Sequence, residues 1–139
     1  MSTLSLRVVS QEQELIRCEA TQVRAPSETG EITILPGHTA LVTKLLVGEL
    51  RYILDGKSHS IVTSDGFLSV SNADEVIVIV DSAVDERNIS IEKAEAAVKA
   101  AQQSLVSSEK REELILAEAS LRRALLEVKV AQRTKRTNL

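Results

Sequence analysis

The chain has 139 residues, of which 43% are hydrophobic and 27% are charged; this fits one compact domain with an appendage and excludes a disordered chain. Tyr52 and Phe67 are its only Phe, Tyr or Trp residues, so the core must be aliphatic and no platform for stacked bases exists, and the single Cys18 excludes an intramolecular disulfide. The net charge of -3 hides a basic segment, residues 122–136, with six Lys/Arg against Glu127.

The first 85 residues carry the alternation of apolar and polar side chains that is typical of half-buried strands, as in residues 4–8. Asp55 and Gly56 separate two such segments, and both residue types tolerate the positive φ that a type I′ hairpin turn requires. Many short strands at regular spacing predict a compact antiparallel sandwich or barrel. Residues 76–80 are apolar throughout, so we expect this strand to be covered on both faces.

After Asp85 the apolar period becomes helical. The seam of a first helix consists of Ile91, Ala94, Val98, Ala101 and Leu105, and Ser90 stands where an N-cap belongs. Residues 106–108 interrupt the period, and a second helix then begins with Glu109, Glu112 and Glu113, which suit the positive end of its dipole. Its seam consists of Leu114, Ala117, Leu121, Ala124 or Leu125, Val128 and Ala131. The short break predicts an antiparallel helical hairpin.

Alanine occupies several seam positions of this hairpin, among them Ala94, Ala101 and Ala117. A leucine in each place would bury about three more carbons, at about 0.8 kcal/mol apiece. Alanine keeps helix propensity at its maximum while it keeps the contact between the helices slight. Two interpretations follow: a movable element whose helices separate, or a static, close-packed hairpin.

The two histidines are the candidate catalytic or metal-binding residues. His59 lies in a predicted strand without a second ligand at metal spacing, and His38 follows a Pro-Gly turn with no nucleophile-elbow sequence in the chain. None of the five glycines belongs to a Gly-rich run that opens a helix, so a phosphate-binding loop is missing. The residues themselves therefore predict neither a catalytic nor a metal site.

The basic segment, residues 122–136, has three candidate partners. Nucleic acid is disfavoured by the acidity of the rest of the chain and by the lack of aromatic residues. A membrane surface would need the apolar face that the first helix already uses. A protein with an acidic surface is the favoured partner. No apolar run approaches the roughly 18 residues of a membrane span, so the sequence predicts none.

The order of the segments resembles a known family. Residues 29–38, TGEITILPGH, contain the spacing Gly-x-x-x-x-Leu-Pro-Gly-His, residues 65–70 carry Gly-Phe before a strand, and the apolar run 76–80 precedes an alanine-rich hairpin. Over essentially the whole chain this resembles the epsilon subunit of F-type ATP synthases, the counterpart of the mitochondrial delta subunit. The resemblance implies an N-terminal antiparallel β-sandwich of about ten strands in residues 1–85 and a C-terminal α-helical hairpin in residues 86–139.

The resemblance also implies a non-catalytic place in the central rotor stalk, where the sandwich contacts the gamma subunit and the ring of membrane c subunits during proton-driven ATP synthesis. The residues that match the rotor-facing region of the family are Glu31, Leu35, Pro36, Gly37 and His38. A proline-fixed turn on a rigid sandwich is suited to this role because it can transmit torque without yielding. His38 is then an interface residue.

In many bacterial members the hairpin is a regulatory arm that obstructs ATP hydrolysis when it extends into the catalytic head of alpha and beta subunits. We expect Arg122, Arg123, Lys129 and Arg133 to meet acidic surface on the beta subunits. The weak alanine seam and the basic end are properties that such an arm needs.

Some members of the family bind ATP at a motif Ile-Asp-x-x-Arg-Ala, which Ile89, Ser90, Lys93 and Ala94 match with two departures. Serine lacks the carboxylate and lysine lacks the bidentate fork, so we expect no cofactor, with ATP binding as the alternative. The family places the chain at the cytoplasmic face of a bacterial inner membrane or the stromal face of a thylakoid. The rival hypothesis is a β-sandwich adaptor that docks an acidic partner through its basic helix.

Overall fold

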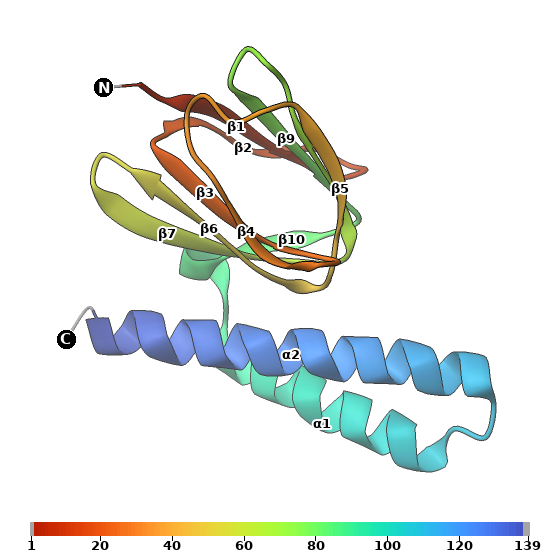
Figure 1. The fold of residues 1–139 in the computed structure, drawn as a ribbon. Coiled ribbons are helices and arrows are strands. Elements are labelled where there is room, and N and C mark those ends of the chain that lie inside the picture. The colour runs from red at the N-terminus through yellow and green to blue at the C-terminus, as the bar shows by residue number, and fades with distance from the viewer. Residues whose placement is uncertain (1, 138–139) are drawn as a thin grey trace. The chain divides into compact units, whose positions relative to one another are not determined.

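A computed structural model describes residues 2–137, with side chains through Arg133. The chain divides into two compact units, one ending at Val84 and one beginning at Asp85, and each is described by itself (Figure 1). The strands are β1 (Leu4–Val9), β2 (Glu14–Ala20), β3 (Gln22–Ser27), β4 (Gly30–Ile34), β5 (Leu41–Leu45), β6 (Gly48–Leu54), β7 (Lys57–Thr63), β8 (Gly66–Val70), β9 (Glu75–Val80) and β10 (Ala83–Asp85). The helices are the 3-10 helix η1 (Glu86–Asn88), α1 (Ile91–Ser107) and α2 (Arg111–Thr137).

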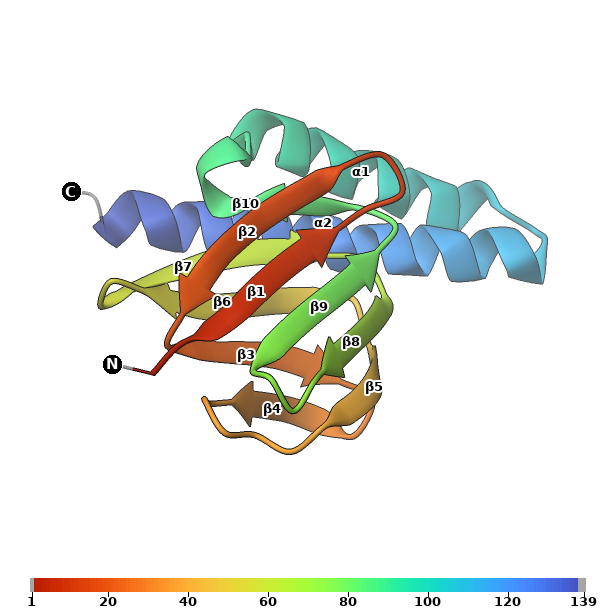
Figure 2. The same ribbon diagram turned by 90° about the horizontal axis from the view of Figure 1, so that it is seen from above.

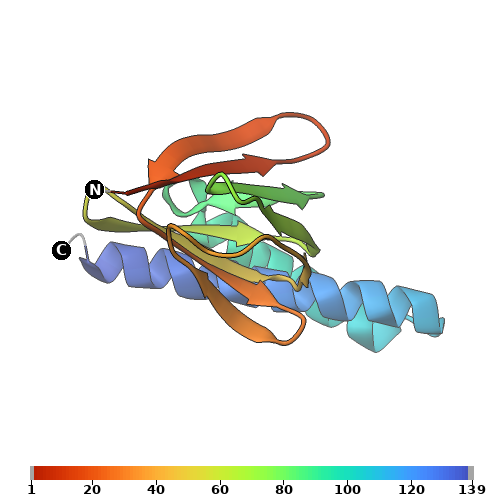
Figure 3. The ribbon, with the colours of Figure 1, turned by 45° about the horizontal axis from the view of Figure 1, so that its top comes forward.

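The ten strands form one sheet that folds over itself into a sandwich, which confirms the predicted class. The strand order is β10-β7-β6-β3-β5-β8-β9-β1-β2, with β4 paired to β3. Figure 2 shows β2, β1, β9, β8 and β5 side by side in one layer. The neighbours from β6 and β7 through β8 and β9 are antiparallel, as is the hairpin of β1 and β2 (Figure 3), whereas β1 and β9 run parallel.

Aliphatic side chains fill the interior of the sandwich, as the shortage of aromatic residues predicts. In β1 the buried Leu4, Leu6 and Val8 alternate with outward residues, which is the period-two pattern of a strand with one buried face. Tyr52 is the aromatic member of the buried cluster. The rest of the cluster includes Val23, Ile34, Leu45, Leu50, Ile61, Leu68, Val76 and Val78.

The apolar run 76–80 is covered on one face only, so the prediction of two covered faces is wrong. Val76, Val78 and Val80 are buried in the core, whereas Ile79 is 57% exposed. An unbroken apolar run does not distinguish a strand buried on both faces from one whose outer face is itself apolar and open. The turn prediction is confirmed: Asp55 and Gly56 have φ of 52° and 77° between paired Leu54 and Lys57, as a type I′ hairpin requires.

The C-terminal unit contains the predicted helical hairpin. Ser90 caps α1, because its hydroxyl accepts a hydrogen bond from the backbone nitrogen of Lys93. The helix continues to Ser107, through most of the expected break, and Glu109 precedes α2 instead of lying in its first turn. Both expectations are wrong. The first fails because serine is tolerated in a last helical turn, where the hydroxyl of Ser107 donates to the carbonyl of Gln103 at 2.9 Å; nothing in the structure explains why α2 begins two residues after Glu109.

Small side chains make the contact between α1 and α2. The buried alanines are Ala94, Ala101, Ala117, Ala124 and Ala131. Of the two alternatives for one seam position, the structure buries Ala124 and leaves Leu125 50% exposed. None of the described helices combines the length and hydropathy needed to cross a bilayer.

Candidate functional site

The Pro-Gly turn predicted as a rotor contact is a well-defined type II turn. The backbone nitrogen of His38 donates to the carbonyl of Leu35 at 3.1 Å, which closes the four-residue turn. Pro36 holds the second position, and Gly37 holds the third with φ of 86°, a value that a type II turn demands and that glycine adopts without strain. The turn is therefore rigid for reasons local to its own four residues.

A second loop anchors this turn from a distant part of the sequence. The backbone nitrogen of Gly37 donates to Oδ1 of Asp74 at 2.8 Å. Asp74 itself has φ of 57°, and its carbonyl accepts a hydrogen bond from the nitrogen of Ser5 at 2.8 Å. The turn after β4 and the loop before β9 are thus joined.

The predicted rotor-facing residues have different exposures. Leu35 is 51% exposed, Glu31 and Gly37 are also exposed, and Pro36 and His38 are half-buried. Nδ1 of His38 lies 2.7 Å from the carbonyl of Thr39, so the ring is held against its own loop. The structure brings residues 35–38 together in one turn and places Glu31 near the start of β4. Glu31 and Leu35 are four steps apart along an extended chain, which corresponds to about 13 Å.

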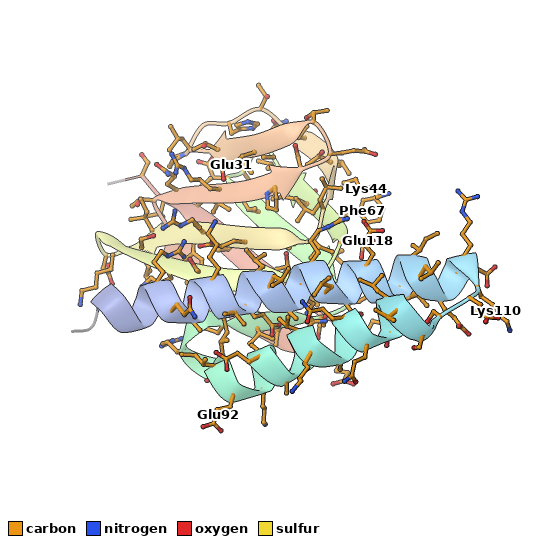
Figure 4. The ribbon with its side chains drawn as sticks, turned by 90° about the horizontal axis from the view of Figure 1, so that it is seen from below. Glu31, Lys44, Phe67, Glu92, Lys110 and Glu118 are labelled. Carbon is orange, nitrogen blue, oxygen red and sulfur yellow. The ribbon has the colours of Figure 1, made fainter. Side chains whose placement is uncertain are left out.

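The outer surface of β5, β8 and β9 carries an exposed apolar cluster, which the sequence reasoning missed. We define the apolar outer face as Val42, Phe67 and Ile79, which are 74%, 57% and 57% exposed. Phe67 lies directly opposite Ile79 on β9 and Lys44 on β5, and Figure 4 shows Lys44 and Phe67 next to one another. Phe67 and Ile79 are direct cross-strand neighbours, whose Cβ atoms are about 5 Å apart, whereas Val42 pairs with Ser69 and lies diagonal to Phe67, at about 7–8 Å. The three side chains therefore lie on one face of the sheet, within reach of one another.

Charged residues on β1 and β2 flank the apolar outer face. The guanidinium of Arg7 lies 2.9 Å from Oε2 of Glu14, and Nε of Arg17 lies 3.2 Å from Oε1 of the same carboxylate. The two guanidinium groups and the one carboxylate leave a net charge of +1 in this cluster. An apolar centre with a polar border is the composition of a protein-binding surface. The signal available in the sequence was the unbroken apolar run in β9, which predicted burial but not what would cover the strand.

The remaining polar residues of the sandwich have structural surroundings. The ring of His59 stacks on Tyr52, with centroids 5.3 Å apart and planes 19° from parallel. Among the described residues, no group of three His, Cys, Asp or Glu side chains is placed to hold a metal ion. Burial raises the pKa of the Cys18 thiol, and the neighbouring charge of Glu19 raises it further. This thiol is therefore less reactive than a free cysteine.

The residues that match the family's ATP motif lie at the start of α1. Oγ of Ser90 is occupied as the helix cap, 3.4 Å from the nitrogen of Lys93. Ala94 is buried in the seam of the hairpin, and the side chain of Lys93 is exposed. Ser90 thus has a structural role that explains it without a nucleotide.

The basic residues of α2 are partly neutralised within the helix. Arg122 lies 3.3 Å from Glu118, and Arg123 lies 3.4 Å from Glu127. Lys129 is exposed and Arg133 is half-buried, while the side chains of residues 134–137, including two of the basic residues, lie outside the described part of the chain. The described residues therefore supply less free positive charge than the sequence count suggests.

A shallow hollow of ≈ 490 Å³ lies between α1 and α2. Its walls are mainly small side chains, among them Ala97, Ala100, Ala117, Ser104 and Ser120. The hollow marks where alanine and serine leave the helices without interlocking side chains. The contact between the helices is correspondingly thin at this point.

A family model and the curated relatives of this chain point to the same family. Residues 3–86 match the family described as ATP synthase, Delta/Epsilon chain, beta-sandwich domain. The chain is 39% identical over 139 residues to the ATP synthase epsilon chain of Dehalococcoides mccartyi, covering 98% of this chain and 97% of that protein. It is 37% identical over 124 residues to the ATP synthase epsilon chain of Desulfitobacterium hafniense, covering 86% and 93%.

Solved structures share the fold. A chain of the Euglena gracilis mitochondrial ATP synthase, OSCP/F1/c-ring, matches with a TM-score of 0.75 and 23% identity, over 97% of this chain and 82% of that one. A chain of the Tetrahymena thermophila mitochondrial ATP synthase central stalk and c-ring matches with a TM-score of 0.62 and 13% identity, over 92% and 96%. At these identities the likeness concerns the fold alone.

Proposed function

This chain belongs to the ATP synthase delta/epsilon chain family, and from that premise we propose that it is a non-catalytic central-stalk subunit of an F-type ATP synthase. In this role it links the gamma subunit to the ring of membrane c subunits and takes no part in bond making. His38 lies against the carbonyl of Thr39 and His59 stacks on Tyr52, so both histidines have structural surroundings.

The observation that carries this proposal is the apolar outer face. Val42, Phe67 and Ile79 expose most of their side chains on adjacent strands, whereas solvent-exposed apolar residues on a monomer are usually scattered. A contiguous patch with a charged border marks a surface that another protein covers. We propose that this protein is the gamma subunit, because the sandwich of epsilon subunits is expected to contact gamma in the rotor stalk.

The turn of residues 35–38 and Glu31 form the proposed contact with the c-ring and the adjoining part of gamma. Leu35 supplies an exposed apolar side chain at the first position of the turn, and the hydrogen bonds of Gly37 and His38 fix the backbone that presents it. A rigid contact suits a part that must rotate with its neighbours, because a yielding loop would lose torque.

The hairpin is proposed to restrain ATP hydrolysis. Five of the buried residues in its seam are alanines, each of which buries less apolar area than a leucine would, so separating the helices costs less free energy than it would for a leucine-rich seam. Once extended, α2 would offer Arg122, Arg123, Lys129 and Arg133 to acidic surface on the catalytic beta subunits. Release of Arg122 from Glu118 costs little free energy, because both side chains are exposed and exposed ion pairs contribute little; the Arg123–Glu127 pair is partly buried.

Removing the hairpin tests this regulatory role. In a reconstituted complex, a chain that ends after Asp85 should raise ATP hydrolysis above the level seen with the full chain. Unchanged hydrolysis, with the shortened chain still bound, would contradict inhibition by the hairpin. Binding of the shortened chain is the necessary control, because the sandwich contains its own core and carries the proposed gamma contact.

The proposed membership of an ATP synthase complex also implies a cellular location for the chain. We place the chain at the cytoplasmic face of a bacterial inner membrane, peripheral to the bilayer and attached through gamma and the c-ring; the bacterial relatives support this placement over a thylakoid.

No nucleotide is assigned to Ile89, Ser90, Lys93 and Ala94, because the Ser90 hydroxyl already caps α1. ATP titration monitored by NMR at the Ser90 and Lys93 amides tests this, and saturable shifts confined to this segment would contradict it.

A further inference from the structure

Asp74 lies in a short loop that is stiffened from several directions. Oγ of Ser71 accepts hydrogen bonds from the nitrogens of Ala73 at 3.2 Å and Glu75 at 3.3 Å. The nitrogen of Ser71 donates to the carbonyl of Glu75 at 2.9 Å. The Asp74 carbonyl is bound by Ser5 at the start of β1. The carboxylate of Asp74 is thus mounted on a closed loop that is tied to the sandwich.

The conformation of Asp74 aims this carboxylate at the turn. Its φ of 57° lies in the left-handed region, which asparagine, aspartate and glycine adopt more readily than other residues. From there Oδ1 accepts the hydrogen bond of the Gly37 nitrogen at 2.8 Å. A charged acceptor makes this bond stronger than one between neutral groups.

The internal geometry of the turn does not determine where the turn lies. Pro36 and the bond from His38 to Leu35 fix its shape, but residues 35–40 connect β4 to β5 without ladder hydrogen bonds of their own. The bond from Gly37 to Asp74 spans 37 positions of sequence and ties the turn to the body of the sandwich. This hydrogen bond therefore fixes the position of the turn relative to the rest of the sandwich, in addition to the turn's own internal shape.

We propose that Asp74 is a positioning residue for rotor coupling: its carboxylate holds the turn of residues 35–38 in place, and so sets where Leu35 and His38 meet the rotor. This inference rests on the proposed function of the turn. It adds a residue from a different loop, outside the stretch that resembles the family's rotor-facing region, to the machinery that transmits rotation.

Two substitutions separate the carboxylate from the backbone conformation. Asp74→Gly keeps access to the left-handed conformation and removes the acceptor, whereas Asp74→Asn keeps both the conformation and an acceptor oxygen. In the full chain, hydrogen exchange of the Gly37 amide should become about 10-fold faster or more in Asp74→Gly, since hydrogen bonds to charged groups are among the stronger ones. Asp74→Asn should stay much closer to the wild-type rate.

The second readout is coupling in the reconstituted complex. Asp74→Gly should lower the number of protons pumped per ATP hydrolysed, and Asp74→Asn should restore it, while both variants melt near the wild-type temperature. Unchanged exchange of the Gly37 amide in Asp74→Gly would overturn the positioning contact, whatever the function of the chain. Faster exchange with unaltered coupling would overturn its role in the rotor, and a chain that fails to join the complex even as wild type would instead contradict the proposed function.

Discussion

Substitution of Phe67 by alanine removes the largest side chain from the apolar outer face while leaving the core intact. A buried phenylalanine covers about 150–250 Å², so a side chain that is 57% exposed presents roughly 110 Å² to a partner. At about 25 cal/mol per Å² this surface contributes up to about 3 kcal/mol to binding. The dissociation constant for gamma should therefore rise by up to roughly 100-fold.

The assay is equilibrium binding of the full chain to isolated gamma subunit, combined with thermal unfolding of the free chain. Two controls bracket Phe67→Ala. Val106→Ala truncates an 88% exposed residue of α1, outside the strands that form the apolar outer face, and should alter neither binding nor stability. Leu68→Ala truncates the fully buried neighbour and should cost about 2–5 kcal/mol of folding stability. A change in affinity for gamma of less than about threefold in Phe67→Ala would refute the assignment of this face.

Three further predictions concern the fold and the hairpin. Gly66→Ala should lower the free energy of unfolding by about 1–3 kcal/mol or more in urea titration, because the added Cβ would stand 2.1 Å from the Ile79 carbonyl oxygen; Gly56→Ala, with open space around it, tests the cost of positive φ alone. Thr63→Val should raise stability by about 1 kcal/mol in the same titration, because the buried Thr63 hydroxyl has no hydrogen-bond partner among the described residues; a loss of stability would show that the hydroxyl is satisfied. Ala100→Leu should fill the hollow between α1 and α2, add up to about 2 kcal/mol to the closed hairpin and weaken inhibition of hydrolysis in the complex; the exposed Ala96→Leu, outside that hollow, should not.

Local sequence patterns predicted much of the architecture because they act over a few residues. The alternation in β1 and the helical spacing from Ala94 to Ala101 reflect the geometry of one strand and one helix. The Asp55-Gly56 turn depends on the φ preferences of two neighbours. In each case the property that selects the structure is contained in the segment itself.

The candidate site was predictable only in part. The turn around Gly37 followed from Pro36 and Gly37, but its bond to Asp74 depends on how β4 and β9 are placed by the complete sheet. The sequence prediction for the apolar outer face was wrong because the hydrophobicity of a strand does not distinguish a face buried in the core from an apolar face on the outer surface. Ile79 has an aliphatic side chain of the kind found in cores, yet it is exposed on the surface of the sandwich.

The central claim is that this chain joins gamma to the c-ring as a rotor subunit. The most direct measurement is ATP-driven proton pumping by membranes whose ATP synthase lacks the corresponding subunit, before and after this chain is added. The account predicts that the full chain restores pumping and binds one copy per gamma subunit. Stoichiometric binding without restored pumping, or pumping restored without contact to gamma, would contradict it.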